Sequence, residues 1–415
     1  MPRLRVKHFG PIQNGVTNDG WIEFKRVTVF VGNQGSGKST LAKLYSTFSW
    51  IEKALERRDY DKSWFEEKDR LTNTFLPYHR LENYISSDQK NQTEIDYEGD
   101  AFTIKYAHGR MHITKSEARE YHLPQIMYVP AERNFISYLR NPEILRLNSP
   151  SLTEFLTEFN YAKENIAGSL ALPINNANLE YDVLKNTLSI REATYRLELA
   201  DASSGFQSAV PLYLVSQYLA KQVFKPIGLR QDTMSSKELE RFRKEASKLL
   251  DESLTIEQQR AVITTISKQF NKTAFINIVE EPEQNLYPNS QWRILQSLLE
   301  INNQGADNHL VMTTHSPYVV NYLTIAVQGK QLHDNILKKK RDVDLMPELA
   351  KVIPLKSLLD ADELAIYQAD EKTGSIARLP MVEGIPSDSN YLNASLRESS
   401  DIFDRLLDIE EELEA

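Results

Sequence analysis

The feature that most constrains the fold is an apolar stretch followed at once by a glycine-rich one. Residues 27–31 are five apolar or β-branched residues in a row, which predicts a buried strand. The next residues match the phosphate-loop pattern G-x-x-x-x-G-K-[ST] at Gly32, Gly37, Lys38 and Ser39, and a predicted helix follows. Glycines let backbone N–H groups converge on an anion, and the positive end of the helix faces the same anion. The two stretches together predict a site for a nucleoside triphosphate.

Two side chains of this loop carry chemistry suited to a triphosphate. The Lys38 ammonium can reach the β- and γ-phosphates, and the Ser39 hydroxyl is suited to Mg²⁺. The pattern alone also arises by chance, but the strand before it and the helix after it are the context in which such loops bind phosphate. We therefore expect a bound nucleotide with Mg²⁺.

Composition narrows the class of protein. The 415 residues are 41% hydrophobic and 26% charged, which is typical of a soluble globular protein, and they include no cysteine. Apolar runs fall short of a membrane span, and residues 1–7 lack the apolar core of a signal peptide, so we expect a cytoplasmic protein without membrane contact. The net charge of −9 argues against a globally basic nucleic-acid binder, although a local basic face that binds nucleic acid stays open.

Short, continuous apolar runs, which are typical of buried strands, alternate with helical segments along much of the chain. Such strands are predicted at 126–129, 273–279 and 309–314, in addition to the one before the glycine-rich loop. This alternation predicts an α/β fold with a mainly parallel sheet. Meanders at 94–114 and 179–199 predict antiparallel sheet.

The expected domain organisation is one elaborated domain with a tail. The head covers 1–330, with a helical and β insertion at about 45–120 and a helical insertion at about 225–270. Within the second insertion, 232–270 is highly charged and predicts a protruding or lid-like helical pair. The extension 331–415 contains a predicted hairpin, 364–367 with 376–379, and an acidic final helix, 401–414.

Three further features stand in a fixed order after the phosphate loop. Residues 203–207 place serine and glycine at a helix start, which taken alone is an ordinary N-cap. The strand 273–279 ends in Glu280 and Glu281: one carboxylate can hold Mg²⁺ through water and the other can act as general base, although adjacent carboxylates also fit a solvated turn. His315 follows the last strand, placed to sense a γ-phosphate, although a lone histidine is more often structural.

In this order the four features resemble the ABC-type ATPases of the SMC and RecF group. The resemblance is closest to compact members with Thr314-His315-Ser316-Pro317 after the last strand, such as the ATPases of overcoming-lysogenization-defect nucleases and of anti-phage systems of the Septu and PARIS kind. It covers roughly residues 1–325 and implies a P-loop NTPase fold with an ABC-type head, a mainly parallel sheet, an antiparallel β subdomain and a helical insertion.

The resemblance also implies roles for individual residues. It implies a Walker A motif at 32–40, a signature at 203–207, a Walker B motif at 277–281 and a switch histidine at His315. The implied cofactors are ATP and Mg²⁺, with Ser39 and Glu280 on the metal and Glu281 and His315 as catalytic residues. The implied nucleotide-binding residues are Gly32, Asn33, Gln34, Gly35, Ser36, Gly37, Lys38, Ser39, Thr40, Ser203, Ser204, Gly205 and Gln207. In the family, the signature serine of one subunit caps the γ-phosphate on its partner, which implies a homo-oligomer built on an ATP-sandwiched dimer.

The sequence departs from the family at several positions. Phe206 replaces the second signature glycine, and Glu280 replaces the usual aspartate. No clear Q-loop glutamine ends the strand 126–129: Gln125 precedes the predicted strand, and residues 130–133 stand in that place. No long coiled coil is predicted, which argues against bridging of distant DNA segments.

Two other stretches could suggest further functions. Residues 381–388 resemble the E-G-x-x-D start of a Toprim nuclease, but the spacing is one residue too long and only 27 residues follow Asp388. The acidic strand ends of a two-metal site have no room there. The basic run 338–341 is read as a solvated loop, with a phosphate contact as the alternative.

We therefore expect an ATP-driven switch that controls a separately encoded effector. The resemblance alone suggests that the effector is a nuclease in bacterial anti-phage defence. Two alternatives stay open: a DNA-repair ATPase of the RecF kind, with a basic face and DNA-stimulated turnover, and a scaffold or sensor that binds ATP without hydrolysing it. Phe206 and Glu280 keep the last alternative open, and a turnover assay separates it from the first.

Overall fold

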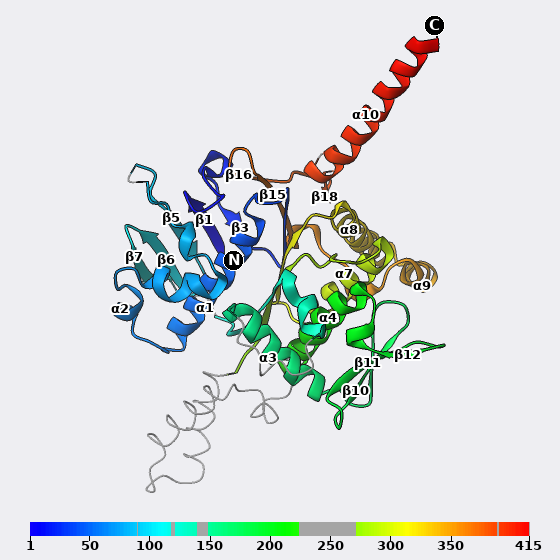
Figure 1. Cartoon of the computed structure of the whole chain (residues 1–415), viewed down its shortest axis with the longest axis horizontal. Helices are drawn as coiled ribbons and strands as arrows, with labels where there is room; N and C mark the ends of the chain where they lie inside the picture. The colour runs from blue at the N-terminus through cyan, green and yellow to red at the C-terminus, as the bar shows by residue number, and fades with distance from the viewer. Residues whose placement is uncertain (89, 118–120, 139–147, 224–270, 388–389, 415) are drawn as a thin grey trace.

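The structure is a computed structural model that describes residues 1–414 except 89, 118–120, 139–147, 224–270 and 388–389 (Figure 1). The helical pair expected at 232–270 and the acidic residue Asp388 lie outside the described residues. The described chain is mixed α/β, as expected, with two larger antiparallel sheets and a two-stranded hairpin beside a mainly parallel sheet.

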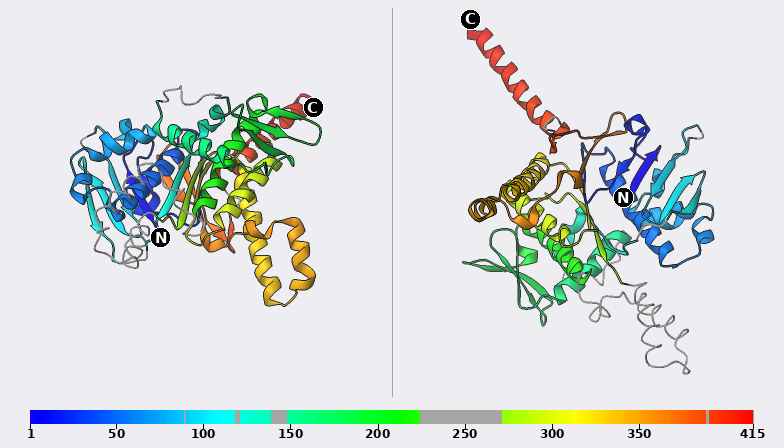
Figure 2. Two further views of the ribbon diagram at one scale, coloured as in Figure 1. Left: turned by 90° about the horizontal axis from the view of Figure 1, so that it is seen from below. Right: turned by 180° about the vertical axis from the view of Figure 1, so that it is seen from behind.

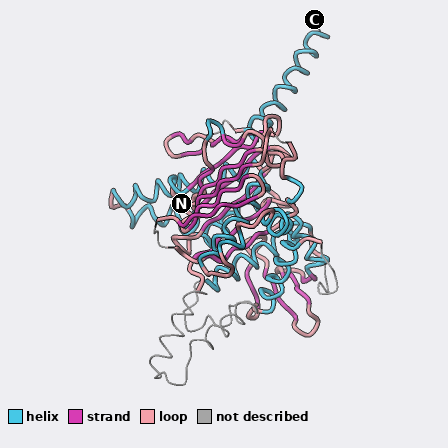
Figure 3. Tube along the Cα trace, turned by 90° about the vertical axis from the view of Figure 1, so that its left-hand side faces the viewer, coloured by secondary structure: helices cyan, strands magenta, loops and turns pink. Residues whose placement is uncertain are grey.

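A seven-stranded sheet forms the centre of the protein, and Figure 3 shows its strands side by side. Five adjacent strands are parallel, and β16 at one side runs antiparallel to β15. The order is β2 (Gly15–Val16), β16 (Ser375–Arg378), β15 (Leu364–Asp370), β4 (Val27–Gly32), β14 (His309–Thr314), β13 (Ala274–Glu280) and β8 (Pro124–Val129).

The strands expected from the sequence are confirmed, with two differences. Gln125 lies inside β8 rather than before it, because the strand already pairs with β13 at Pro124. The hairpin expected in the extension is present as β15 and β16, but β15 lies in the central sheet next to β4, with Leu364 opposite Val27. The helix α8 (Pro317–Lys338) spans residue 330, the expected boundary between the head and the extension. Strands from both of these parts lie in the central sheet. The domain division itself stays a prediction.

Both faces of the central sheet are buried. Along β4, Val27, Val29 and Val31 face one apolar cluster and Phe30 faces the other. The first cluster packs under α4 (Ser204–Val223), α7 (Pro288–Asn302) and α8, and the second packs under α1 (Lys38–Glu56) (Figure 1). A strand buried on both faces carries a continuous apolar run, which explains why β4 was recognisable from the sequence.

Two antiparallel sheets flank this core and appear on opposite sides of it in Figure 2. The meander expected at 94–114 joins the N-terminal hairpin in a sheet of β3 (Ile22–Glu23), β1 (Arg3–Lys7), β5 (Glu94–Glu98), β6 (Phe102–Ala107) and β7 (Arg110–Lys115). The second sheet contains β12 (Arg196–Glu198), β11 (Thr187–Arg191), β10 (Asn178–Asp182) and β9 (Ser169–Ala171).

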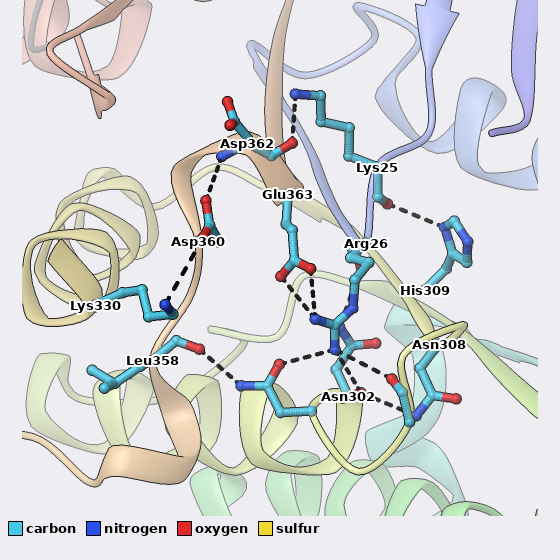
Figure 4. Close-up of polar contacts among 12 residues, drawn as sticks. Lys25, Arg26, Asn302, Asn308, His309, Lys330, Leu358, Asp360, Asp362 and Glu363 are labelled. Carbon is cyan, nitrogen blue, oxygen red and sulfur yellow. Dashed lines mark hydrogen bonds and ion pairs between the residues drawn. The ribbon is translucent and has the colours of Figure 1, made fainter. Parts of the chain in front are cut away.

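A polar cluster fixes the start of β15 to the start of β4 (Figure 4). The Arg26 guanidinium donates to both carboxylate oxygens of Glu363, at 2.9 and 2.7 Å. Its other nitrogen donates to the carbonyl oxygens of Asn302 and Gly305, and to Asn303 Oδ1, all near the end of α7. One side chain therefore holds together the residues before β4 and β15 and those at the end of α7.

The remaining elements are short, apart from two helices. The longer helices are α3 (Pro150–Glu164) and α10 (Tyr391–Glu414), the latter beginning ten residues before the expected final helix. Residues 381–388 contain a small hairpin, β17 (Met381–Val382) with β18 (Ile385–Pro386), whose two turn residues Glu383 and Gly384 have φ of 53° and 79°. The others are α2 (Lys62–Phe65), α9 (Asp342–Val352) and helical turns η1 (Thr17–Asp19), η2 (Leu71–Phe75), η3 (Leu76–His79), η4 (Glu82–Tyr84), η5 (Ala131–Tyr138), η7 (Leu199–Asp201), η10 (Leu355–Ser357) and η11 (Ala361–Glu363). Among the described helices, none combines the length and the apolar composition needed to cross a membrane.

Candidate nucleotide site

The glycine-rich loop connects the end of β4 to the start of α1. Gly32, Gly35 and Gly37 have φ of 148°, 74° and 99°, conformations that a residue with a Cβ rarely adopts. Gly37 caps α1 without a side-chain hydrogen bond, so the N–H groups of the first turn lie open to an anion. Within the loop, Asn33, Gln34 and Gly35 are exposed, Ser39 is half-buried, and Ser36, Lys38 and Thr40 are buried.

Neighbouring segments of the chain pack closely around this loop. A Cβ at Gly32 would lie 2.4 Å from the carbonyl oxygen of Ala369 in β15, and one at Gly37 would lie 2.9 Å from the Ile12 side chain. Asn33 Nδ2 donates to Glu371 Oε1, at 3.1 Å, just beyond the end of β15. The extension therefore forms one wall of the loop, which the sequence did not indicate.

Lys38 is buried and surrounded by acceptors. Its Nζ donates to the carbonyl oxygens of Gly32 (3.0 Å) and Asn33 (2.7 Å). Burial lowers the pKa of Lys38 to about 8, although the carboxylates of Glu281 and its neighbours act in the opposite direction. A polyphosphate in the loop would add negative charge that favours the protonated form of this desolvated side chain.

The two carboxylates after β13 differ in environment. Glu280 is buried at the end of the strand: the N–H of Ala131 donates to its Oε2 at 3.3 Å, and its Oε1 has no hydrogen-bond partner in the described part of the chain. Glu281 is half-buried and has φ of +44°, a left-handed conformation that is rare for a residue other than glycine. Its N–H donates to the carbonyl of Thr313, at 2.9 Å. Such strained residues gather at functional sites.

His315 follows β14 and lies beside the second carboxylate. Its Nε2 is 3.6 Å from Glu281 Oε1, and its backbone N–H donates to Glu283 Oε1 at 2.8 Å. Burial and the nearby Lys38 lower the pKa of His315, while Glu281 and the backbone of Gly32 act in the opposite direction. The neutral imidazole is therefore favoured, and it can both accept and donate a hydrogen bond.

Arg133 is a site residue that the sequence analysis missed. Its side chain is fully buried and donates to four backbone carbonyls: Pro130 (3.3 Å), Glu280 (2.6 Å), Glu281 (2.6 Å) and Ser208 (3.0 Å). Burial lowers the pKa of Arg133 to about 10. The residue stands where a Q-loop glutamine was sought, and an arginine after a buried strand was the available signal. It connects the ends of β8 and β13 to the helix α4, which begins in the predicted signature.

The residues of the predicted signature, 203–207, are divided between surface and core. Ser203 and Ser204 are exposed at the start of α4, and Gly205 lies against the carbonyl oxygen of Asn285. Phe206 and Gln207 are buried, and Gln207 Nε2 donates to the carbonyl of Ala200. The Gln207 amide is thus engaged in the fold. Among the described residues, no hydrogen bond or ion pair joins 203–207 to 32–40. The structure brings the other site residues together and leaves the signature apart.

The residues present fit a nucleotide with Mg²⁺. The loop offers free backbone donors and a desolvated cation, and Glu280 Oε1 and the Ser39 hydroxyl are hard oxygen ligands. In the described part of the chain no group of three or more histidines and carboxylates could hold a metal by itself. Mg²⁺ usually takes one or two protein ligands together with phosphate oxygens and water, and Glu280 and Ser39 would supply these protein ligands.

Comparison with known proteins gives distant similarities. No family model matches the chain. The Bacillus subtilis cell division ATP-binding protein FtsE is 29% identical over 97 residues, which is 23% of this chain and 40% of that relative. The chain therefore matches less than half of the length of this curated relative.

Solved structures with similar folds have low sequence identity. The SMC head domain from Thermotoga maritima is 12% identical, with a TM-score of 0.31 over 77% of this chain and 90% of that one. The Smc head domain with an extended coiled coil, bound to the C-terminal domain of ScpA from Pyrococcus furiosus, is 11% identical, with a TM-score of 0.38 over 98% and 100%. The ATP-binding cassette MJ0796, bound to ADP and Pi, is 14% identical, with a TM-score of 0.25 over 78% and 91%. The α/β fold, with the glycine-rich loop directly after the central strand β4, follows from the strand order and pairings of this chain itself.

Proposed function

We propose that the protein is an ABC-type ATPase that binds ATP and Mg²⁺ between two copies of the chain and uses hydrolysis as a switch. One observation carries this proposal: Lys38, Glu281 and His315, from three separate elements, converge beside the phosphate loop. If Glu281 belonged only to a solvated turn and His315 were only structural, nothing would require these side chains to meet beside the phosphate loop.

Each of these residues has a role that follows from its surroundings. Lys38 and the N–H groups of the first turn of α1 bind the phosphates and stabilise negative charge that develops on them. Glu281, half-buried and held in one backbone conformation, accepts a proton from the attacking water. His315, neutral and 3.6 Å from Glu281, orients that carboxylate and the γ-phosphate. Ser39 and Glu280 would hold Mg²⁺, which supplies charge neutralisation between the phosphates.

The exposure of the predicted signature residues supports the proposal that ATP binds between two copies of the chain. Ser203 and Ser204 are exposed and make no described contact with the phosphate loop of their own chain. A helix start with exposed donors suits the phosphate held by a partner subunit, in a two-fold arrangement with two equivalent sites. Of the implied signature ligands, the buried Gln207 would support the helix from inside rather than touch the nucleotide.

Complementation between two inactive variants tests the shared site. Lys38→Ala removes the phosphate-loop cation and keeps the signature, whereas Ser204→Arg blocks the signature and keeps the loop. Each alone should lose turnover. A 1:1 mixture should recover up to about a quarter of wild-type turnover, because half of the dimers are mixed and each has one complete site of two. Ser169→Arg, at another exposed serine on β9, is the matched control and should stay active. A mixture with no recovery, from subunits shown to exchange, contradicts the shared site.

We further propose that the switch acts on a separately encoded effector, a nuclease of bacterial anti-phage defence. The resemblance of the four sequence features supports this part. Glu383 and Gly384, the first two residues of the Toprim-like pattern, form the turn of the β17–β18 hairpin in the structure. Purified alone, the protein should leave DNA uncut in the presence of ATP with Mg²⁺ or Mn²⁺. Cleavage that disappears in Asp388→Ala would show a metal site in this chain, and turnover stimulated by DNA would favour a repair ATPase.

A further inference from the structure

The final helix α10 leaves the body of the protein at its first residues. The backbone N–H of Tyr391 donates to Gln368 Oε1 at 2.8 Å, and Gln368 in β15 pairs with Val31, one residue before the phosphate loop. Beyond this root, Figures 1 and 2 show α10 projecting away from every other element. The projecting part of α10 is therefore attached, through its first residues, to β15, which pairs with the strand β4 that leads into the phosphate loop.

The projecting part carries an apolar stripe that the body does not cover. Its members recur at helical spacing over two turns, as in Ile402, Leu406 and Ile409 at positions i, i+4 and i+7. All are exposed: Ile402 by 55%, Phe403 by 60%, Leu406 by 58%, Leu407 by 42% and Ile409 by 55%. Five large apolar side chains on one helical face form a contiguous patch, and such patches mark interaction sites.

The same helix carries most of the net charge of the protein. From Tyr391 to Glu414 there are eight carboxylates and two arginines, so α10 has a net charge of −6 out of −9 for the whole chain. The exposed Asp401, Asp404, Asp408 and Glu411 lie around the side of the helix opposite the stripe. The acidic character of the chain is thus concentrated next to the patch.

The negative charge of α10 narrows the kinds of partner that could cover the apolar stripe. Two copies of α10 packed together would bring two helices of charge −6 into contact, and like charges at such short range oppose pairing. An anionic lipid surface would repel the same carboxylates. An apolar groove or helix rimmed by lysine and arginine satisfies both features.

We propose that α10 is the docking helix for a separate protein whose binding groove is apolar with a basic rim. The stripe fills the groove, and the carboxylates set the orientation and speed the association. This inference rests on the proposed function only in taking that protein to be the effector. Because the root of α10 bonds to β15 beside the phosphate loop, the docked partner would be joined to the nucleotide site through one strand pair.

A defined probe tests the surface in the full-length protein. The probe is a fluorescent synthetic helix with a leucine stripe and lysines on its other side, and the control peptide replaces every lysine by glutamate. Anisotropy should show binding of the lysine peptide, at least about tenfold weaker binding of the glutamate peptide, and weakening by 0.5 M salt.

Two α10 variants separate the apolar and charged contributions. Phe403→Ser with Leu406→Ser removes apolar area at constant charge, and Asp401→Asn with Asp404→Asn and Asp408→Asn removes charge at constant stripe. Each should weaken binding of the lysine peptide by about tenfold or more. Val183→Ser with Leu184→Ser, at an apolar pair exposed by 75% and 97% on the β10–β11 turn, is the matched control and should bind like wild type.

Other results would overturn the proposal. These are equal binding by the α10 variants, a dimer in light scattering that is lost in the Phe403 and Leu406 variant, or co-sedimentation of the protein with phosphatidylserine vesicles through α10. Lys38→Ala should still bind the peptide, and the α10 variants should keep their basal ATP turnover. Failure of the docking proposal is therefore distinguishable from failure of the ATPase proposal.

Discussion

The Arg133 guanidinium donates a 2.6 Å hydrogen bond to the carbonyl oxygen of Glu281, the residue with a left-handed backbone. The N–H of Glu281 bonds to Thr313, so both sides of this residue are held. A backbone conformation that costs on the order of 1–3 kcal/mol persists only where such contacts impose it. Arg133 is thus the positioning residue for the carboxylate that faces His315.

Replacing Arg133 should reduce turnover more than nucleotide binding. Arg133→Met leaves four carbonyls without this donor, and we expect the free energy of unfolding to fall by about 3 kcal/mol and kcat by about 10- to 100-fold, with KM for ATP little changed. Arg133→Lys should recover only part, because an ammonium cannot reproduce the planar fork. Arg80→Met removes an exposed arginine paired with Glu132 and is the matched control. Equal losses of kcat and ATP affinity would mean that Arg133 only maintains the fold.

Lys38→Ala should abolish ATP binding and leave the fold intact. The side chain is the cation that the loop carbonyls of Gly32 and Asn33 hold in place, and its pKa of about 8 indicates a desolvated charge. Calorimetric titration measures the affinity, and circular dichroism confirms the fold. Lys43→Ala, on the same helix α1, is the control and should bind as wild type. Near wild-type affinity in Lys38→Ala would remove the Walker A assignment.

Glu52 should make stability depend on pH. Its carboxylate accepts hydrogen bonds from Tyr97 Oη (2.8 Å) and the N–H groups of Ala101 (2.7 Å) and Phe102 (3.0 Å), yet burial raises its pKa from 4.5 to about 7. Between these values the folded protein keeps a proton that the unfolded chain has lost. The free energy of unfolding should therefore decrease as pH rises from about 4.5 to 7, by about 3 kcal/mol from this group.

Urea unfolding at pH 5 and pH 8 measures this effect. In Glu52→Gln the group cannot ionise, so the decrease from pH 5 to pH 8 should be smaller than in wild type by about 3 kcal/mol. Glu56→Gln, one turn further along α1 and exposed, should follow the wild-type profile. The same pH difference in wild type and Glu52→Gln would show that Glu52 is ionised throughout.

Arg26 should stabilise the attachment of β15 to the core. One guanidinium nitrogen, Nη1, donates to both carboxylate oxygens of Glu363, and Nη2 donates to three acceptors near the end of α7 (Figure 4). Arg26→Ala should lower the free energy of unfolding by about 2 kcal/mol, because several charge-assisted bonds are lost together. Lys351→Ala breaks an exposed pair with Glu348 and should cost less than about 0.5 kcal/mol. A loss no larger in Arg26→Ala than in this control contradicts the role.

The parts of the fold that were predictable have local signals. The apolar run of β4, the glycines after it and the carboxylates after β13 are each contained in a few consecutive residues. The pairing of β15 with β4 joins residues more than 300 positions apart, and a strand pattern does not specify its partner. The place of Gln125 inside β8 depended in the same way on pairing with β13.

The roles of buried polar residues also needed the structure. Arg133 has no motif, and only the meeting of β8, β13 and α4 gives it four acceptors. Phe206 and Gln207 face the core because α4 turns that side inward, which a match to a signature pattern does not encode. Ser203 and Ser204 remain exposed, as a shared site requires.

The most direct test of the central claim is ATP hydrolysis by Glu281→Gln, measured together with molecular mass. Glutamine keeps the shape and hydrogen bonds of the side chain beside His315 but cannot accept the proton of water. Phosphate release should fall by about 10²- to 10⁴-fold, and light scattering should show an ATP-dependent dimer that persists because the nucleotide is not hydrolysed. Hydrolysis at the wild-type rate, or a mass that ATP leaves unchanged, would contradict the shared-site ATPase.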